Sequence, residues 1–299
     1  MRVDDEMVMQ CACCGIAGVD DIKLKDCDDC DLVKYCSDEC QKDHRPKHEE
    51  ECQQRVAELE DELLFKQPEG SHLGDCPICC LPIPLDPTKF CLHPCCCKII
   101  CKGCNFAILK RGTEGRLQLT CSFCRKALSS TDDEINKSLM KRIEANDPAA
   151  MCHMGTEKCD EGDYTGAVEY WTRSAALGSV EAHYQLSTLY RSGEGVEKDK
   201  KRELHHLTEA AIGGHAEARY NLGYIETENC RVDRAVKHFI ISAKLGIDKS
   251  LECLKDLYRE GLASKEDFTA ALRGYQVAIE ATKSPQREEA TELEKRWFK

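Results

Sequence analysis

Apolar residues recur at helical spacing along the rear of the chain. Residues 129–146 carry a helix signal, with acidic residues in the first turn and basic residues later, as the helix dipole favours. The triplet Asn146-Asp147-Pro148 interrupts the pattern, and Pro148 suits the first turn of a new helix. We therefore expect a connecting helix over 129–146 and further helices behind it.

From there the pattern of small and apolar residues repeats. Four similar segments (AMCHMGTEK, AHYQLSTLY, ARYNLGYIE and SLECLKDLY) begin 32, 36 and 32 residues apart. Their first residues are Ala150, Ala182, Ala218 and Ser250. In a second register, the segments SAALG, EAAIG and SAKLG end at Gly178, Gly213 and Gly246. Closely packed helix pairs need small residues at fixed positions, so residues 147–282 are predicted to form a helical repeat.

The front of the chain has few large apolar residues and many cysteines. Of the 23 cysteines, 19 lie within the first 124 residues, most of them in C-x2-C pairs. Such a turn aims two thiolates at one tetrahedral zinc ion, and two pairs complete a structural site. Segments of about 45 to 55 residues with so small a core rarely fold without a metal or disulfides. The pairs are Cys11/Cys14, Cys27/Cys30, Cys76/Cys79, Cys101/Cys104 and Cys121/Cys124.

The sequence and its composition narrow the cellular compartment and the class of partner that we expect. The segment MRVDDEMVMQ lacks the features of a signal peptide, and no run approaches the ~20 apolar residues of a membrane span. We therefore expect a soluble, non-secreted protein, cytoplasmic or nuclear, whose cysteines are zinc thiolates rather than disulfides. The formal net charge is -12, and bound zinc thiolates would make it more negative. This balance disfavours binding to nucleic acid.

The charge is unevenly distributed between the two cysteine-rich segments. Residues 1–64 contain 8 Lys/Arg against 19 Asp/Glu, a net charge of -11. Residues 65–130 contain 9 Lys/Arg against 4 Asp/Glu, a net charge of +5. The two segments are therefore expected to meet different partners.

The ligand spacing over residues 11–52 is the most specific motif. The string CDLVKYCSDECQKDHRPKHEEEC contains C-x3-C and H-x3-C, spacings that place two side chains on one helical face. It resembles the MYND-type zinc finger in ligands and in the residues between them. This resemblance implies two interleaved zinc sites on a domain that binds short, often proline-containing peptides. The implied ligands are Cys11, Cys14, Cys36 and Cys40 for one zinc, and Cys27, Cys30, His48 and Cys52 for the other.

Two further residues of this segment need an interpretation. His44 lies four residues before His48 and could compete with it as a ligand, but we expect His44 to be exposed. Cys13 is adjacent to Cys14 and is expected to point away from the metal as a spare thiol.

Residues 76–124 resemble a RING-type cross-brace, in which the first and third ligand pairs share one zinc and the second and fourth share another. The resemblance implies one site of Cys76, Cys79, Cys101 and Cys104. The other site would take Cys121 and Cys124 with two residues of the run 95–97. We favour Cys95 with Cys96; Cys95 with Cys97 is the alternative, and Cys91 and His93 remain candidates. Four zinc ions are therefore expected, two per module.

RING domains that act as ubiquitin ligases dock a conjugating enzyme on an apolar residue of the first ligand loop, and often carry a basic residue after the last ligand. Ile78 and Arg125 stand at these positions. However, Ser122 replaces a common proline, and an all-cysteine second pair is atypical. Ligase activity is therefore the alternative interpretation rather than the first.

The repeats resemble Sel-one-like repeats, a tetratricopeptide-related family, most clearly at YRSGEGVEKDKKRE with its glycine-rich loop. The third repeat departs from the pattern, because ETENCRVDRA lacks the Gly-x-Gly-Val segment, and its turn is expected to be shorter. Repeats of this kind form superhelical scaffolds with extended binding surfaces.

These observations predict a mainly α protein: two small cross-brace zinc modules followed by an α-helical repeat solenoid. We find no catalytic or cofactor motif besides the zinc ligands, and neighbouring pairs such as Cys152-His153 diverge on a helix. The predicted function is a zinc-binding adaptor for proteins or peptides; the alternative is a RING-type ubiquitin ligase that binds a conjugating enzyme and whose repeats recruit the substrate. The predicted segments are 11–52 (MYND-type finger), 53–75 (helix and linker), 76–128 (RING-like finger), 129–146 (connecting helix), 147–282 (repeats) and 283–299 (C-terminal tail).

Overall fold

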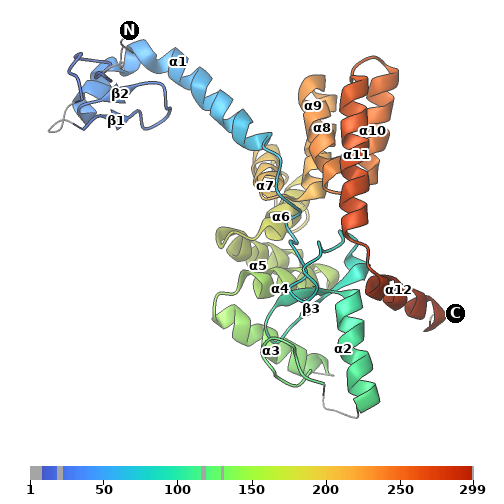
Figure 1. Ribbon diagram of the computed structural model, residues 1–299. Coiled ribbons are helices and arrows are strands. Elements are labelled where there is room, and N and C mark those ends of the chain that lie inside the picture. Colours follow the sequence, from blue (N-terminus) through green and yellow to red (C-terminus); the bar gives the residue numbers. More distant parts are fainter. Residues whose placement is uncertain (1–8, 19–22, 116–118, 129–130, 298–299) are drawn as a thin grey trace, which may run out of the picture. The chain divides into compact units, whose positions relative to one another are not determined.

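The computed structural model describes residues 9–18, 23–115, 119–128 and 131–297 (Figure 1). The first two residues of the expected connecting segment, 129–130, and the last two of the tail, 298–299, lie outside this range. The chain divides into two compact units, Met1–Lys66 and Gln67–Lys299. Helices dominate what is described, and the strands form only two-stranded sheets. The fold class is therefore mainly α, as predicted.

The first unit is organised by one long helix. Strands β1 (Lys25–Asp26) and β2 (Lys34–Tyr35) pair in antiparallel fashion, and α1 (Asp38–Leu64) follows. The Ser37 side chain caps α1 by accepting a hydrogen bond from the Cys40 amide. Residues 53–64 contain neither Gly nor Pro, so the helix continues past Cys52 without interruption. The helix expected within residues 53–75 is thus the second half of α1.

The second unit begins with a short linker and the second cysteine-rich segment. A 3-10 turn, η1 (Pro87–Lys89), leads into the antiparallel hairpin of β3 (Phe90–His93) and β4 (Lys98–Cys101). Phe90 faces Cys101 and His93 faces Lys98 in this hairpin. Helix α2 (Lys102–Gly115) follows β4 directly.

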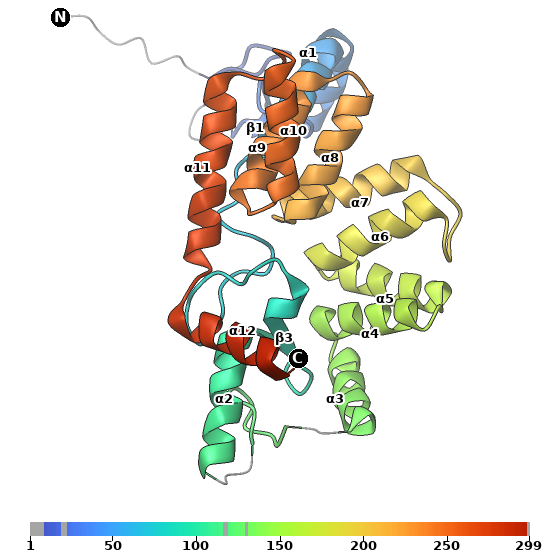
Figure 2. The same cartoon turned by 90° about the vertical axis from the view of Figure 1, so that its right-hand side faces the viewer.

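Eight helices of the second unit form four antiparallel pairs. Within the pairs α4/α5, α6/α7 and α8/α9 the packing is most extensive, and each pair also packs on the next (Figures 1 and 2). Helix α3 (Asp132–Glu144) precedes them and packs on α4. The pairs are α4 (Pro148–Asp160) with α5 (Tyr164–Ala176), α6 (Val180–Ser192) with α7 (Lys200–Ile212), α8 (Ala216–Glu228) with α9 (Val232–Lys244), and α10 (Asp248–Arg259) with α11 (Lys265–Ala281).

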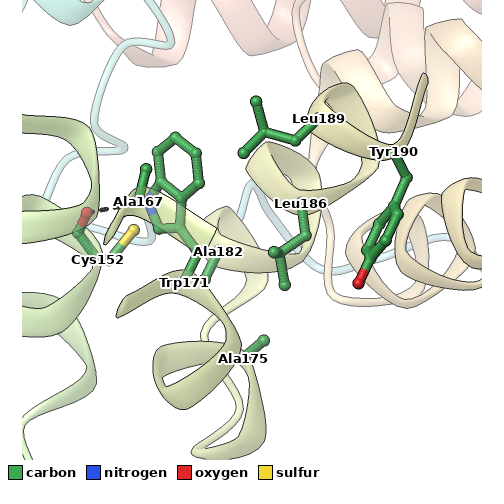
Figure 3. Packing of buried hydrophobic residues seen from close by; sticks show 8 residues of the cluster. All are labelled: Cys152, Ala167, Trp171, Ala175, Ala182, Leu186, Leu189 and Tyr190. Atoms are coloured by element: carbon green, nitrogen blue, oxygen red, sulfur yellow. Dashed lines mark hydrogen bonds between the residues drawn. The ribbon is translucent and has the colours of Figure 1, made fainter. Parts of the chain in front are cut away.

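The small residues of the first register lie in the core of the repeats. Ala150, Ala182, Ala218 and Ser250 are all 0% exposed. In the first of these interfaces Trp171 of α5 covers Gly155 of α4, and its indole N–H donates to the Cys152 carbonyl at 3.1 Å (Figure 3). Around it pack Ala167, Ala175, Ala182, Leu186, Leu189 and Tyr190. The period read from the sequence is therefore the period of the core.

The glycines of the second register end helices, with one shift. Gly178 and Gly246 follow α5 and α9 with φ of 85° and 107°, the left-handed region that glycine adopts without strain. After α7 it is Gly214, with φ 87°, rather than the aligned Gly213, that takes this conformation. In the third repeat the turn between α8 and α9 is short, as expected, and Cys230 adopts φ 58° there.

The carboxyl-terminal residues contain a helix that the sequence pattern did not reveal. Helix α12 (Pro285–Trp297) packs on α2 of the second cysteine-rich segment. Pro285 occupies the first position of α12, where its missing N–H costs nothing. Among the described helices, none combines the length and the apolar composition that crossing a membrane requires.

The contact between Gly155 and Trp171 gives a test of the repeat core. A Cβ on residue 155 would lie 2.6 Å from the Trp171 ring. We expect Gly155→Ala to lower the free energy of unfolding by about 1–3 kcal/mol, because overpacking outweighs the better helix propensity of alanine. Denaturant unfolding of the zinc-loaded chain measures the change. Adding Trp171→Leu should make the Gly155→Ala step nearly neutral; an equal loss in both backgrounds would contradict the contact.

Candidate metal centres

Three C-x2-C pairs share one backbone geometry. The amides of Gly15, Cys80 and Arg125 donate to the carbonyls of Cys11, Cys76 and Cys121 at 2.9, 2.8 and 3.0 Å. Each donor follows the second cysteine of its pair and has a positive φ, of 74°, 54° and 60°. This turn brings both sulfurs of a pair to the same side of the backbone. Only one of the three positions is a glycine, so Cys80 and Arg125 hold a conformation that L-residues rarely adopt.

Backbone amides stabilise the thiolate of the first cysteine in each of these pairs. Burial alone would raise the pKa of Cys11, but the amides of Cys14, Cys36 and Cys13 bring it down to about 6. By the same balance the pKa values of Cys76 and Cys121 fall to about 7. A thiolate is the form that binds a metal, so these turns prepare a ligand before any ion arrives.

The sulfur separations match the edges of a zinc tetrahedron. Four sulfurs about 2.3 Å from one zinc ion lie ~3.8 Å from one another. Sulfur–sulfur distances are 3.5 Å for Cys14–Cys36, 3.9 Å for Cys27–Cys52, 3.8 Å for Cys79–Cys101 and 3.6 Å for Cys96–Cys121. One such edge recurs in each of four groups, so each group has the dimensions of a structural zinc site.

In the first unit, two groups interleave along the chain. One contains Cys11, Cys14, Cys36 and Cys40, and the other contains Cys27, Cys30, His48 and Cys52. His48 is buried and directs Nε2 to within 3.2 Å of Cys30 Sγ, while the Glu51 carboxylate lies 3.8 Å from its Nδ1. At 3.8 Å the carboxylate is an ion-pair neighbour of the ring and not a hydrogen-bond partner, and Nδ1 has no hydrogen-bond partner among the described residues.

His44 does not join either group. Its Nδ1 lies 3.1 Å from the hydroxyl of Tyr35, and its ring stacks on His48. Our expectation that His44 is exposed was therefore wrong, because the ring is half-buried between these two neighbours. Tyr35 is itself 2% exposed, and burial together with the nearby thiols raises its pKa to about 12. His44 thus supports the core between the two sites. Cys13 is exposed, in keeping with a spare thiol.

In the second unit, two further groups alternate in the order of a cross-brace. The first and third pairs bring together Cys76, Cys79, Cys101 and Cys104, and the second and fourth bring together Cys95, Cys96, Cys121 and Cys124. Cys97 takes no part: its φ is 52° and its side chain packs with Leu139 and Met151 in the core. The chain reverses direction at this residue, which separates Cys97 from the two sulfurs before it. That each of the sixteen side chains ligates zinc stays our prediction.

The other candidate ligands of this module lie elsewhere. Cys91 belongs to β3 and packs with the apolar residues around Ile100, and burial raises its pKa to about 11. His93 is 4% exposed and contacts Asn105, and burial lowers its pKa. Neither side chain belongs to a four-ligand group among the described residues.

The chemistry of the four groups fits Zn²⁺. Crowded thiols oppose one another's ionisation: hydrogen bonds with Cys14 and Cys40 raise the pKa of Cys36 to about 12, and burial beside Cys30 and Cys27 does the same for Cys52. A divalent cation removes this conflict, because it allows all four ligands to be anionic at once. With four protein ligands, zinc has no open position for substrate, so the sites are structural.

A fifth cluster, which no local spacing could have revealed, joins His72, Glu181 and His215. Glu181 Oε2 lies 3.1 Å from His72 Nε2 and 3.3 Å from His215 Nε2. Burial opposes ionisation of Glu181, but hydrogen bonds from the two histidines hold its pKa below the usual range. His215 Nδ1 accepts a hydrogen bond from the Ala218 amide, so its Nε2 carries the proton and cannot bind a metal. The cluster is a hydrogen-bonded tether between the linker and the repeats.

A groove lies beside the second site of the first unit. Its volume is about 340 Å³, and one face of α1 forms its wall. The lining residues are Cys27, Asp29, Tyr35, Gln41, Arg45, His48, Glu49, Cys52, Gln53, Val56, Ala57 and Glu60.

The contrast between the two histidines of α1 tests the ligand assignment. We expect His48→Ala to leave three zinc ions on the chain, because it removes a ligand from a buried site, whereas His44→Ala should retain four. Native mass spectrometry of the zinc-loaded variants counts the ions. Loss of one ion from both variants, or from neither, would refute the assignment.

Comparison with known proteins assigns the first module. Residues 11–52 match the family model of the MYND finger. Among curated proteins, the chain is similar to the DAP3-binding cell death enhancer 1 of Mus musculus, with 24% identity over 203 residues, covering 54% of this chain and 40% of that protein. An uncharacterised protein of Neisseria meningitidis is 30% identical over 130 residues, covering 44% of this chain and 27% of that protein. The chain thus spans about two fifths or less of these relatives.

Two solved structures of repeat proteins match part of the chain. A Sel1 repeat protein from Oxalobacter formigenes has a TM-score of 0.45 and 25% identity, and the match covers 60% of this chain and 80% of that one. The protective antigen c5321 of uropathogenic Escherichia coli, which displays an SLR fold, has a TM-score of 0.41 and 27% identity, covering 49% and 33%. On the family match and on its own geometry, the chain contains a MYND finger at residues 11–52, followed by a RING-like zinc module and an α-helical repeat solenoid.

Proposed function

We propose that this protein is a zinc-dependent adaptor whose MYND finger docks a short peptide in the groove beside α1, while the repeats hold a second protein. The observation that carries the proposal is the groove itself. It lies against a zinc site, so the metal that folds the finger also fixes the groove wall. A volume of about 340 Å³ is at the low end for ligand sites, which suits a few side chains of an extended segment.

The lining of the groove favours a peptide with an apolar residue next to a basic one. Val56 and Ala57 supply apolar surface, and Asp29, Glu49 and Glu60 supply negative charge. The single base, Arg45, is already 3.4 Å from the Asp29 carboxylate. The excess of acidic residues over the first 64 residues would attract such a ligand from a distance.

The names of two relatives agree with an adaptor function, but they describe those proteins and not this chain. The mouse and rat relatives are named for binding DAP3, a statement about those proteins. A protein-binding role for the repeats of this chain is our proposal, and it leaves the bound partner open to experiment.

Filling the groove tests the peptide site. We expect Ala57→Arg to weaken binding of peptides selected from a random library by at least ~10-fold, because Ala57 lines the groove and the new side chain blocks it. Gln54→Arg makes the same charge change on α1 outside the groove lining and should bind as the wild type does. Isothermal titration with zinc content held at four measures both. Equal affinities for the two variants would remove the groove from the proposal.

The second candidate function, a RING-type ubiquitin ligase, is favoured by one observation. Ile78 is 42% exposed rather than a core residue, and Arg125 is exposed as well. Both therefore stand free to meet a conjugating enzyme.

We nevertheless expect no ubiquitin chains from the wild-type protein in a reconstituted reaction with common conjugating enzymes, because Ser122 stands where a proline is usual. Ile78→Ala, which should retain four zinc ions, is the matched variant. Robust chain formation by the wild type that Ile78→Ala abolishes would replace the adaptor with the ligase.

A further inference from the structure

Helix α12 contacts a zinc site whose first ligands lie more than 200 residues before it in the chain. Figures 1 and 2 both show α12 beside α2, the helix that follows the third cysteine pair. Gln286 Nε2 donates to the Gly103 carbonyl at 3.0 Å, and Lys110 pairs with Glu289 at 3.1 Å. The end of the repeat solenoid is thus fastened to the cysteine-rich module at its start.

Arg287 is the centre of this contact. Its Nη2 donates to Cys79 Sγ at 3.3 Å and to the Leu81 carbonyl at 3.1 Å. Its Nη1 donates to the carbonyls of Pro82 and Thr282, both at 2.7 Å. One guanidinium therefore holds a candidate zinc ligand, the backbone just after it, and the turn before α12.

The cysteine-rich module leaves space for the Arg287 side chain at Gly103. Gly103 lies between Cys101 and Cys104, and a Cβ there would be 2.9 Å from Cγ of Arg287. The glycine of this C-x2-C pair thus allows the arginine stem to lie against the ligand turn. Any other residue at 103 would push Arg287 away from the thiolates.

The charges at this contact are complementary. Zn²⁺ with four thiolates carries a net charge of -2, and Arg287 brings a positive charge to its edge. Hydrogen bonds to the ligands of a metal tune its affinity, and removing them typically costs ~10- to 100-fold.

We propose that Arg287 is a positioning residue for the zinc site of Cys76, Cys79, Cys101 and Cys104, and that α12 is a zinc-dependent clasp closing the repeat solenoid onto this module. Zinc retention and α12 docking are then reciprocal: the loaded site holds the helix, and the helix stabilises the loaded site.

The test compares Arg287→Gln with Lys283→Gln in the full zinc-loaded chain. Lys283 pairs with Glu280 at 2.7 Å on the surface, so Lys283→Gln removes one positive charge near the same turn without touching the module. We expect Arg287→Gln to release one of its four zinc ions to a chelator ~10-fold faster or more, with the other three unchanged. Lys283→Gln should release all four at wild-type rates.

Hydrogen exchange of residues 285–297 gives the second readout. Exchange should rise in Arg287→Gln, and it should rise equally in the wild type after zinc removal. Arg287→Lys keeps the charge but not the fork of donors, so its zinc release should be faster than that of the wild type and slower than that of Arg287→Gln. This variant replaces Arg287→Gln in the test if Arg287→Gln fails to fold. Equal zinc release from Arg287→Gln and Lys283→Gln, or α12 protection that survives zinc removal, would overturn the proposal. Neither readout depends on peptide binding in the groove.

Discussion

The conflict among crowded thiols, and its relief by a divalent cation, underlies both cysteine-rich modules. Sulfurs 3.5 to 3.9 Å apart cannot all ionise unaided, which is why burial and neighbouring thiols raise the pKa values of Cys36 and Cys52. The modules have little apolar core to compensate. Zinc therefore contributes much of their folding free energy, and the groove proposed to dock a peptide depends on the loaded state.

The spacing of residues along the chain predicted those features that depend on neighbouring residues, namely the ligand pairs and the buried positions of the repeats. The C-x2-C pairs and the H-x3-C step fix which side chains can converge, and the repeat period located Ala150, Ala182, Ala218 and Ser250, all of them fully buried. The choice within the run 95–97 was harder, because three consecutive cysteines differ only in backbone direction. The positive φ of Cys97 separates it from the other two.

Contacts between distant residues were beyond prediction. Glu181 meets His72 across 109 positions, and Arg287 meets Cys79 across 208. Each residue looks ordinary in its own helix, and the partner is set by how four helix pairs turn in space. The half-buried position of His44 was missed for a related reason, because its neighbour Tyr35 comes from a different element. A single sequence gives no warning of such pairs.

The bond between Arg287 and the Pro82 carbonyl, 205 positions apart, turns an open coil of helices into a ring. In an open solenoid each terminal repeat has a neighbour on one side only, so the terminal repeats fray first and the superhelix can lengthen or unwind under load. While α12 stays docked on α2, the last repeat is held on both sides and cannot fray freely. The helix pairs can form before this ring closes, so the loop-closure entropy of a contact 205 positions apart is a cost of docking α12 alone.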